Sequence, residues 1–292
     1  MFEKIFFPVD LSETSSSVIR AIKEMKKFGT EEVHLFHAIE YDPVALIEGG
    51  VDVDEFVAKL KRKAEEKMTQ HVKELSKYFK VSYSILPTID AAKAIVENSE
   101  GYTAMLIPSR SKTTLSLGKT TEKVIKASEI PTLVIRTRQG LRENHYEAMF
   151  AELFSKIAFL HDLSDGVSGK IQETANMLAK FGVREICIVH VVELDVALET
   201  KLSREEIMNP LLPIPKIAEI LSEYWMKARS KLEKIERSLN SSGFTTSVVV
   251  RFGSSERSIE RIVKEEKISL VVVWRKNFDE VSRAEVPVFV LK

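Results

Sequence analysis

The segment FEKIFFPVDLS at residues 2–12 decides the fold, because it recurs as FSKIAFLHDLS at residues 154–164. Each copy is a short apolar run that ends in an aspartate, a leucine and a serine. Such a run is typical of a strand buried on both faces of a parallel sheet. The segment therefore predicts the first strand and the first turn of a domain that occurs twice.

Three further stretches match between the two halves in the same order. They are Phe28-Gly29 with Phe181-Gly182, VHLFHAIE (33–40) with ICIVHVVE (186–193), and EIPTLVI (129–135) with EVPVFVL (285–291). Four matches in one order indicate an internal duplication. A chain of 292 residues has room for two domains of the usual size.

Short apolar runs alternate with amphipathic, charge-rich stretches in both halves, which predicts an α/β fold with right-handed crossovers. The expected strands lie near 3–9, 33–39, 80–86, 104–108 and 132–136, and near 156–160, 186–192, 245–251, 269–274 and 286–291. Stretches such as 54–78 carry helical spacing. We expect a first domain at 1–139, a polar linker at 140–152 and a second domain at 153–292.

Composition excludes several classes of protein. Lys+Arg and Asp+Glu both number 43, so no net charge favours nucleic acid or an acidic membrane. No apolar run approaches the length of a membrane span, and the first residues lack a signal-peptide pattern. The single cysteine, Cys187, lies in an apolar run, which predicts a buried thiol and a reducing cytoplasm.

Ligands of open parallel sheets bind at the carboxyl ends of the strands, so the turns there carry the candidate chemistry. After the first strand, Asp10 is a candidate acceptor for a base or ribose, and Ser12 is a candidate helix cap. The alternative is that both residues only cap the following helix. The sequence leaves both interpretations open.

The loop after the fourth strand is rich in hydroxyl groups and carries Arg110, Lys112 and Lys119 before a helix at 121–127. Helix N-termini and basic side chains attract anions, which favours a phosphate cradle. The alternative is a solvated loop with helix caps. Gly118-Lys119-Thr120 is no P-loop, because position 113 is threonine and the segment follows the fourth strand.

Other chemistries find little support in the sequence. The six histidines form no close ligand cluster, and His37 and His190 sit at matching strand ends, which predicts packing or a capping bond. No nucleophile elbow is present, so hydrolytic catalysis rests on no positive evidence.

These motifs resemble those of the universal stress protein family, twice over and across nearly the whole chain. The family's marks are an aspartate after the first strand, a His-Val-like end to the second, and a glycine-rich loop after the fourth. Asp10 and Asp162 match the first mark, and His37 and His190 match the second. The LGKTTEKVI segment at 117–125 is similar to the family's pattern after that loop. The resemblance implies two tandem five-stranded Rossmann-like sandwiches, akin to adenine nucleotide alpha hydrolases and paired by pseudo-twofold symmetry.

In members that bind ATP or AMP, the aspartate contacts adenine and the glycine loop wraps the phosphates. Carried onto this chain, the resemblance implies nucleotide contacts in the first domain at Pro8, Val9, Asp10, Ala38, Ile107, Ser109, Arg110, Ser111, Gly118, Lys119 and Thr120. Mg²⁺ accompanying ATP is the one metal expected. Pro108 and Ser111 replace the family's leading glycines, which weakens backbone contacts to phosphate.

The second domain departs further from the family. From Arg110 to Pro131 is 21 positions, whereas from Lys276 to Pro287 is 11, with no glycine between them. A phosphate cradle has no room there, so Asp162 is expected to cap its turn.

Three functions follow. The first is a stress-type regulatory protein whose first domain binds ATP or AMP. The second is a nucleotide-independent scaffold with a protein partner, and the third, a slow ATP hydrolase, has the least support. We expect a homodimer, with neither nucleic acid nor membrane as partner. Residues 132–135 are expected to pair with 288–291, because each closing strand otherwise leaves an open sheet edge.

Overall fold

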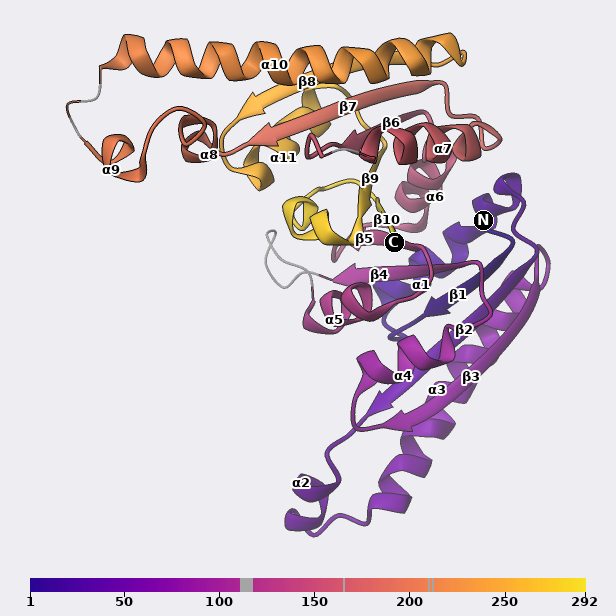
Figure 1. Ribbon diagram of the computed structural model, residues 1–292. Helices are drawn as coiled ribbons and strands as arrows, with labels where there is room; N and C mark the ends of the chain where they lie inside the picture. Colours follow the sequence, from indigo (N-terminus) through magenta and orange to yellow (C-terminus); the bar gives the residue numbers. More distant parts are fainter. Residues whose placement is uncertain (111–117, 165, 210, 212) are drawn as a thin grey trace. The chain divides into compact units, whose positions relative to one another are not determined.

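The computed structural model describes residues 1–110, 118–164, 166–209, 211 and 213–292. The chain divides into two compact units (Figure 1). The first unit comprises Met1–Glu152 with Pro287–Lys292, and the second comprises Leu153–Val286. In each unit, helices cover a largely parallel sheet, so the predicted α/β fold class is confirmed.

The sheet of the first unit has the strand order β3-β2-β1-β4-β5-β10. Its strands are β1 (Lys4–Pro8), β2 (Glu32–Glu40), β3 (Lys80–Thr88), β4 (Ala104–Arg110), β5 (Thr132–Thr137) and β10 (Val288–Leu291). Ile5 lies opposite Val33 on one side and Ala104 on the other, so β1 is central. The strand order reverses at β1, which places the carboxyl ends of β1, β2 and β4 around one crevice.

The helices of the first unit begin in different ways, several of them at a short polar side chain. They are α1 (Glu13–Ala21), the 3-10 helix η1 (Ile22–Phe28), α2 (Pro43–Glu48), α3 (Val53–Leu75), α4 (Ala91–Asn98), α5 (Lys119–Ala127) and α6 (Glu143–Ala151). Ser12, Asp42, Asp52 and Asp90 each accept hydrogen bonds from first-turn amides. On α3 the buried residues recur every three or four positions, and most of its Lys and Glu side chains are exposed.

Helix α6 occupies most of the segment predicted as a linker. It lies in the first unit, where Tyr146 and Phe150 are fully buried. Glu143 accepts a hydrogen bond from Arg20 of α1 at 2.6 Å. Two aromatic residues four positions apart supply a narrow apolar stripe, which is enough to anchor an otherwise polar stretch.

The second unit repeats the arrangement with the strand order β9-β6-β7-β8. Its elements are β6 (Lys156–Leu160), α7 (Val167–Ala179), β7 (Glu185–Val192), α8 (Leu194–Leu198), α9 (Arg204–Ile207), α10 (Ile214–Ser241), β8 (Thr245–Phe252), α11 (Ser255–Glu265), β9 (Leu270–Trp274) and the 3-10 helix η2 (Arg275–Val281). Cys187 is buried as predicted, and burial raises the pKa of its thiol to about 11. Among the described residues, no helix combines the length and apolar character of a membrane span.

The predicted pairing of the two closing strands is confirmed. β10 runs antiparallel to β5, with Val288 opposite Val134 and Phe289 opposite Leu133. The ring of Phe289 is fully buried and lies 5.3 Å from that of Phe2. The last strand of the chain thus completes the sheet of the first unit.

Truncating Phe289 should therefore destabilise the first unit. Phe289→Ala removes a fully buried ring, which typically lowers the free energy of unfolding by about 3–5 kcal/mol. Hydrogen exchange of the β5 amides should accelerate accordingly. The matched control is Ile47→Ala, because Ile47 is 68% exposed and should leave the exchange unchanged. Unchanged exchange in Phe289→Ala would contradict the pairing.

Candidate functional site

A pocket of about 340 Å³ opens in the first unit at the carboxyl ends of β1, β2 and β4. Helices α4 and α5 form its other wall. The residues that line it are Pro8, Val9, Asp10, Ser15, Phe36, His37, Ala38, Glu40, Ala91, Ile95, Ile107, Pro108, Gly118, Thr120 and Thr121. Its size is that of a small-molecule site.

The turn after β1 is held by Asp10. Its Oδ1 accepts hydrogen bonds from the Ser12 amide at 3.0 Å and the Ser12 hydroxyl at 2.6 Å. Ser12 in turn accepts from the Ser15 amide at 3.2 Å and caps α1. Leu11 between them takes a left-handed conformation (φ 56°), which is uncommon for leucine and is enforced by these bonds. Ser12 therefore caps α1, and Asp10 holds the turn that precedes the helix.

A histidine fixes the end of β1 from the neighbouring strand. His37 of β2 donates from Nδ1 to the carbonyl of Val9 at 2.8 Å, one residue beyond the end of β1. In the second unit, His190 of β7 donates to the carbonyl of His161 at the same distance. Of the two roles predicted for this pair, packing or a capping bond, the structure shows the bond. Because His37 lines the pocket, the bond also shapes the site.

Seven of the predicted contact residues line the pocket: Pro8, Val9, Asp10, Ala38, Ile107, Gly118 and Thr120. Ser109 is buried, and Lys119 is exposed and does not line the pocket. Arg110 ends β4, whereas its side chain and Ser111 lie outside the described residues, as does Lys112.

Sequence reasoning missed the wall contributed by α4. Ala91 and Ile95 line the pocket although they lie far from the three strand ends in sequence. Glu40 accepts a hydrogen bond from the Ala91 amide at 3.3 Å and ties α4 to β2. The signal was Asp90, whose side chain caps α4 and sets where that helix begins.

The corresponding edge of the second unit is built differently, with η2 in place of the loop that follows β4. β9 passes directly into η2, whose Phe278 and Val281 are buried. Lys276 donates to Oδ2 of Asp162 at 2.5 Å, while the Ser164 amide and hydroxyl donate to Oδ1. Burial opposes ionisation of Asp162, but these hydrogen bonds outweigh it and hold its pKa below the usual range. Asp162 thus holds the turn after β6 and pairs with Lys276, whereas α7 begins at Gly166 without a side-chain cap, so the predicted helix capping by Asp162 is not observed.

The fold and the pocket define a two-unit α/β protein with a pocket at the strand ends of its first unit. Residues 1–136 match the model of the universal stress protein family. Universal stress protein MJ0577 of Methanocaldococcus jannaschii is 34% identical over an alignment of 159 residues, and the match covers 48% of this chain and 98% of that protein. The chain belongs to the universal stress protein family.

Solved structures extend the likeness of fold to both units. A universal stress protein from Archaeoglobus fulgidus DSM 4304 has a TM-score of 0.69 at 18% identity, covering 99% of this chain and 96% of that one. A putative universal stress protein from Pseudomonas aeruginosa UCBPP-PA14 has a TM-score of 0.56 at 13% identity, covering 100% and 93%. At these identities the likeness shows the fold.

The buried His161 should make the stability of the second unit depend on pH. Burial lowers the pKa of His161 to about 4, whereas an unfolded histidine titrates near 6.5. The unfolded state takes up the proton first as pH falls. The free energy of unfolding should therefore drop by about 2–3 kcal/mol between about pH 6.5 and pH 4, with no further loss from this group below.

Both tryptophans, Trp225 and Trp274, lie in the second unit, so their fluorescence during urea unfolding measures this effect. His161→Val, which installs the residue found at Val9 of the first unit, should flatten the dependence. A residual slope is expected from His190, whose pKa is also lowered by burial. Equal slopes in the wild type and the variant would refute the assignment.

Proposed function

We propose that this chain is a stress-type regulatory protein whose first unit binds an adenine nucleotide in the 340 Å³ pocket. The observation that supports this proposal most is the difference between the two units at the ends of their strands. The first unit has an open pocket at its strand ends, whereas η2 and the Lys276–Asp162 ion pair close that edge of the second. Nucleotide binding at the strand ends is accordingly a property of the first unit alone.

The walls of the pocket suit a purine. Val9, Ala38 and Ile107 at the strand ends and Ile95 of α4 present apolar surface to the pocket. The carboxylates of Asp10 and Glu40 lie at the same pocket and are acceptors for ribose hydroxyl or adenine amino groups. A purine nucleoside is a planar, partly polar ring system joined to a sugar. It matches both the volume of the pocket and its mixture of apolar and carboxylate groups.

The phosphates are assigned to the start of α5. Gly118 is the N-cap of that nine-residue helix and supplies no side-chain cap to its first-turn amides. Amides at such a position attract anions. Thr120 adds a hydroxyl, and Ser109, Arg110, Ser111 and Lys119 complete the proposed contacts, with Mg²⁺ accompanying ATP. Pro108 brings no N–H donor, which is why we propose weak binding.

A nucleotide-independent scaffold is the second candidate, and exposed apolar side chains favour it. Met208, Leu211 and Ile214 of the second unit are each more than three-quarters exposed. Apolar groups gathered on a surface are typical of protein interaction sites.

Within either function we propose domains at 1–139 and 153–292, a cytoplasmic location and a homodimer. Light scattering that shows only monomer at tens of micromolar would count against the dimer.

Nucleotide titration tests the proposal. AMP and ATP should raise the melting temperature, because a ligand that binds only the native state stabilises it. Ala38→Phe should abolish the shift by filling the pocket. Arg110→Ala and Lys119→Ala should each weaken binding about tenfold by removing a charge-assisted bond to phosphate.

The matched control is Lys93→Ala, an exposed lysine of α4 paired with Glu97 outside the pocket, which should bind like the wild type. Binding that survives Ala38→Phe would place the nucleotide elsewhere. If millimolar nucleotide gives no heat of binding by calorimetry and no shift in melting temperature, the scaffold function is favoured.

A further inference from the structure

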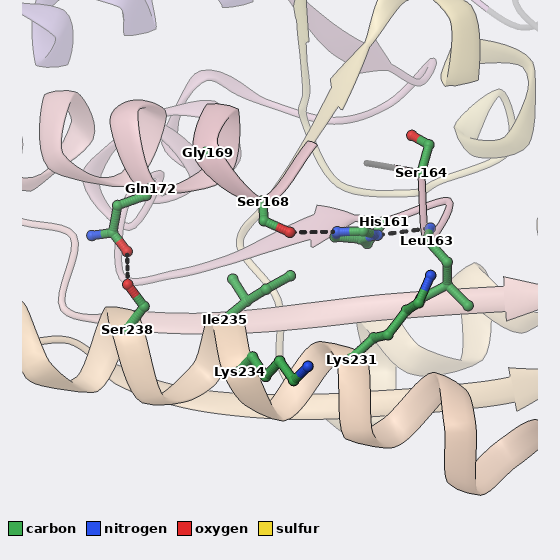
Figure 2. A pocket seen from close by; sticks show the side chains of 10 residues that line it. All are labelled: His161, Leu163, Ser164, Ser168, Gly169, Gln172, Lys231, Lys234, Ile235 and Ser238. Atoms are coloured by element: carbon green, nitrogen blue, oxygen red, sulfur yellow. Dashed lines mark hydrogen bonds between the residues drawn. The ribbon is translucent and has the colours of Figure 1, made fainter. Parts of the chain in front are cut away.

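A second pocket, of about 550 Å³, lies in the second unit between α7 and α10 (Figure 2). We call it the basic pocket, because Lys231 and Lys234 of α10 line it. Its other groups include Ser168 and Gly169 of α7, with His161 at the end of β6. The nucleotide pocket of the first unit is bounded instead by α4 and α5, so the two sites are not counterparts.

The counterpart of the basic pocket in the first unit is filled. There Ser16 of α1 meets Nε2 of His71 of α3 at 3.3 Å. Counted back from the matched Phe28 and Phe181, Gly169 stands at the position of Ser16. A Cβ built on Gly169 meets no atom within 4 Å, so open space lies at this position.

The long helices correspond in the same way. Counted back from Leu75 and Leu239, which are both buried near the ends of their helices, Ile235 stands at the position of His71. The hydrogen-bonded pair that bridges α1 and α3 is thus absent between α7 and α10. Its loss leaves a hollow with an apolar floor of Ile235 and Leu163.

The charge of the basic pocket is unbalanced. Within the part of the chain that the structure describes, neither Lys231 nor Lys234 lies within 4.0 Å of a carboxylate. Two neighbouring cations of α10 are paired: Lys227 with Glu223 and Arg229 with Glu233. Two uncompensated ammonium groups at one concave site favour an anion.

His161 adds a neutral donor. Its Nδ1 accepts the Leu163 amide at 2.7 Å, so the proton of the neutral ring is on Nε2. That nitrogen faces the Ser168 hydroxyl at 3.4 Å, a long contact at the wall of the pocket (Figure 2). Because burial keeps the ring neutral at physiological pH, Nε2 offers a hydrogen bond without adding charge.

We propose that the basic pocket binds the phosphate group of a small molecule. Lys231 and Lys234 supply the charge, and His161 Nε2–H and the Ser168 hydroxyl supply directed donors. Lysine binds phosphate as a point charge, so no bidentate geometry is required. The volume exceeds that of phosphate alone, and the floor of Ile235 and Leu163 receives an apolar part of the ligand. This site is independent of the nucleotide proposal.

NMR titration of the full chain with inorganic phosphate at constant ionic strength tests the proposal. The amides of Ser168 and Gly169 and the ring of His161 should shift, with a dissociation constant on the order of 1 mM. Acetate at the same ionic strength should shift them much less. Lys231→Gln and Lys234→Gln should each weaken binding about fivefold. The matched control, Lys216→Gln, changes a lysine of α10 that does not line the pocket and should have no effect.

A second variant keeps the test decisive. Gly169→Ser combined with Ile235→His restores the side chains that fill the first unit, and it should abolish the phosphate shift at Ser168. The exposed lysine variants leave the core intact, so their result stands even if this double variant is unstable. Phosphate shifts that are confined to the first unit, that ignore both lysine variants, or that acetate reproduces would overturn the proposal.

Discussion

Both units depend on one hydrogen bond. A histidine at the end of the second strand donates it to the backbone carbonyl just beyond the first strand. His37 makes it to Val9, and His190 makes it to His161. The bond extends the contact between β1 and β2, and between β6 and β7, one residue past the last paired residues. It thereby fixes where the turn that contains Asp10 or Asp162 starts, and that turn positions the helix that follows.

Each unit uses this shared frame differently. In the first, the chain leaves β4 toward α5 and a pocket remains over the strand ends. In the second, the shorter connection coils into η2 and buries Phe278 where an open site would need space. Lys276 then compensates Asp162 within the protein. The two units thus differ at their strand ends, and the basic pocket of the second unit lies between α7 and α10.

Much of the fold was predictable because the central strands are continuous apolar runs flanked by clear turns. The ten expected strands are found within a few residues of their predicted places. Helix α6 was missed because only Tyr146 and Phe150 distinguish it from a polar linker. Of the site, the residues next to the strand ends were predicted from topology. Ala91 and Ile95 were not, because they reach the pocket only through the packing of α4.

The basic pocket shows a different limit of sequence reasoning. Gly169 and Ile235 are unremarkable as single residues, and their meaning appears only beside Ser16 and His71 of the other unit. His161 likewise stands at the position of Val9. Its sequence position alone does not predict a role, because that role depends on its burial and on its hydrogen bond with the Leu163 amide. Comparison between the two copies therefore carries information that neither copy holds alone.

The central claim is that one strand-end site is open and its duplicate is closed. Diffraction from crystals grown with AMP tests this claim most directly. The account predicts electron density for adenine over the ends of β1, β2 and β4, between Ala38 and Ile107, and none over the ends of β6, β7 and β9. Adenine density at the strand ends of the second unit, beside Asp162 and Lys276, would contradict it.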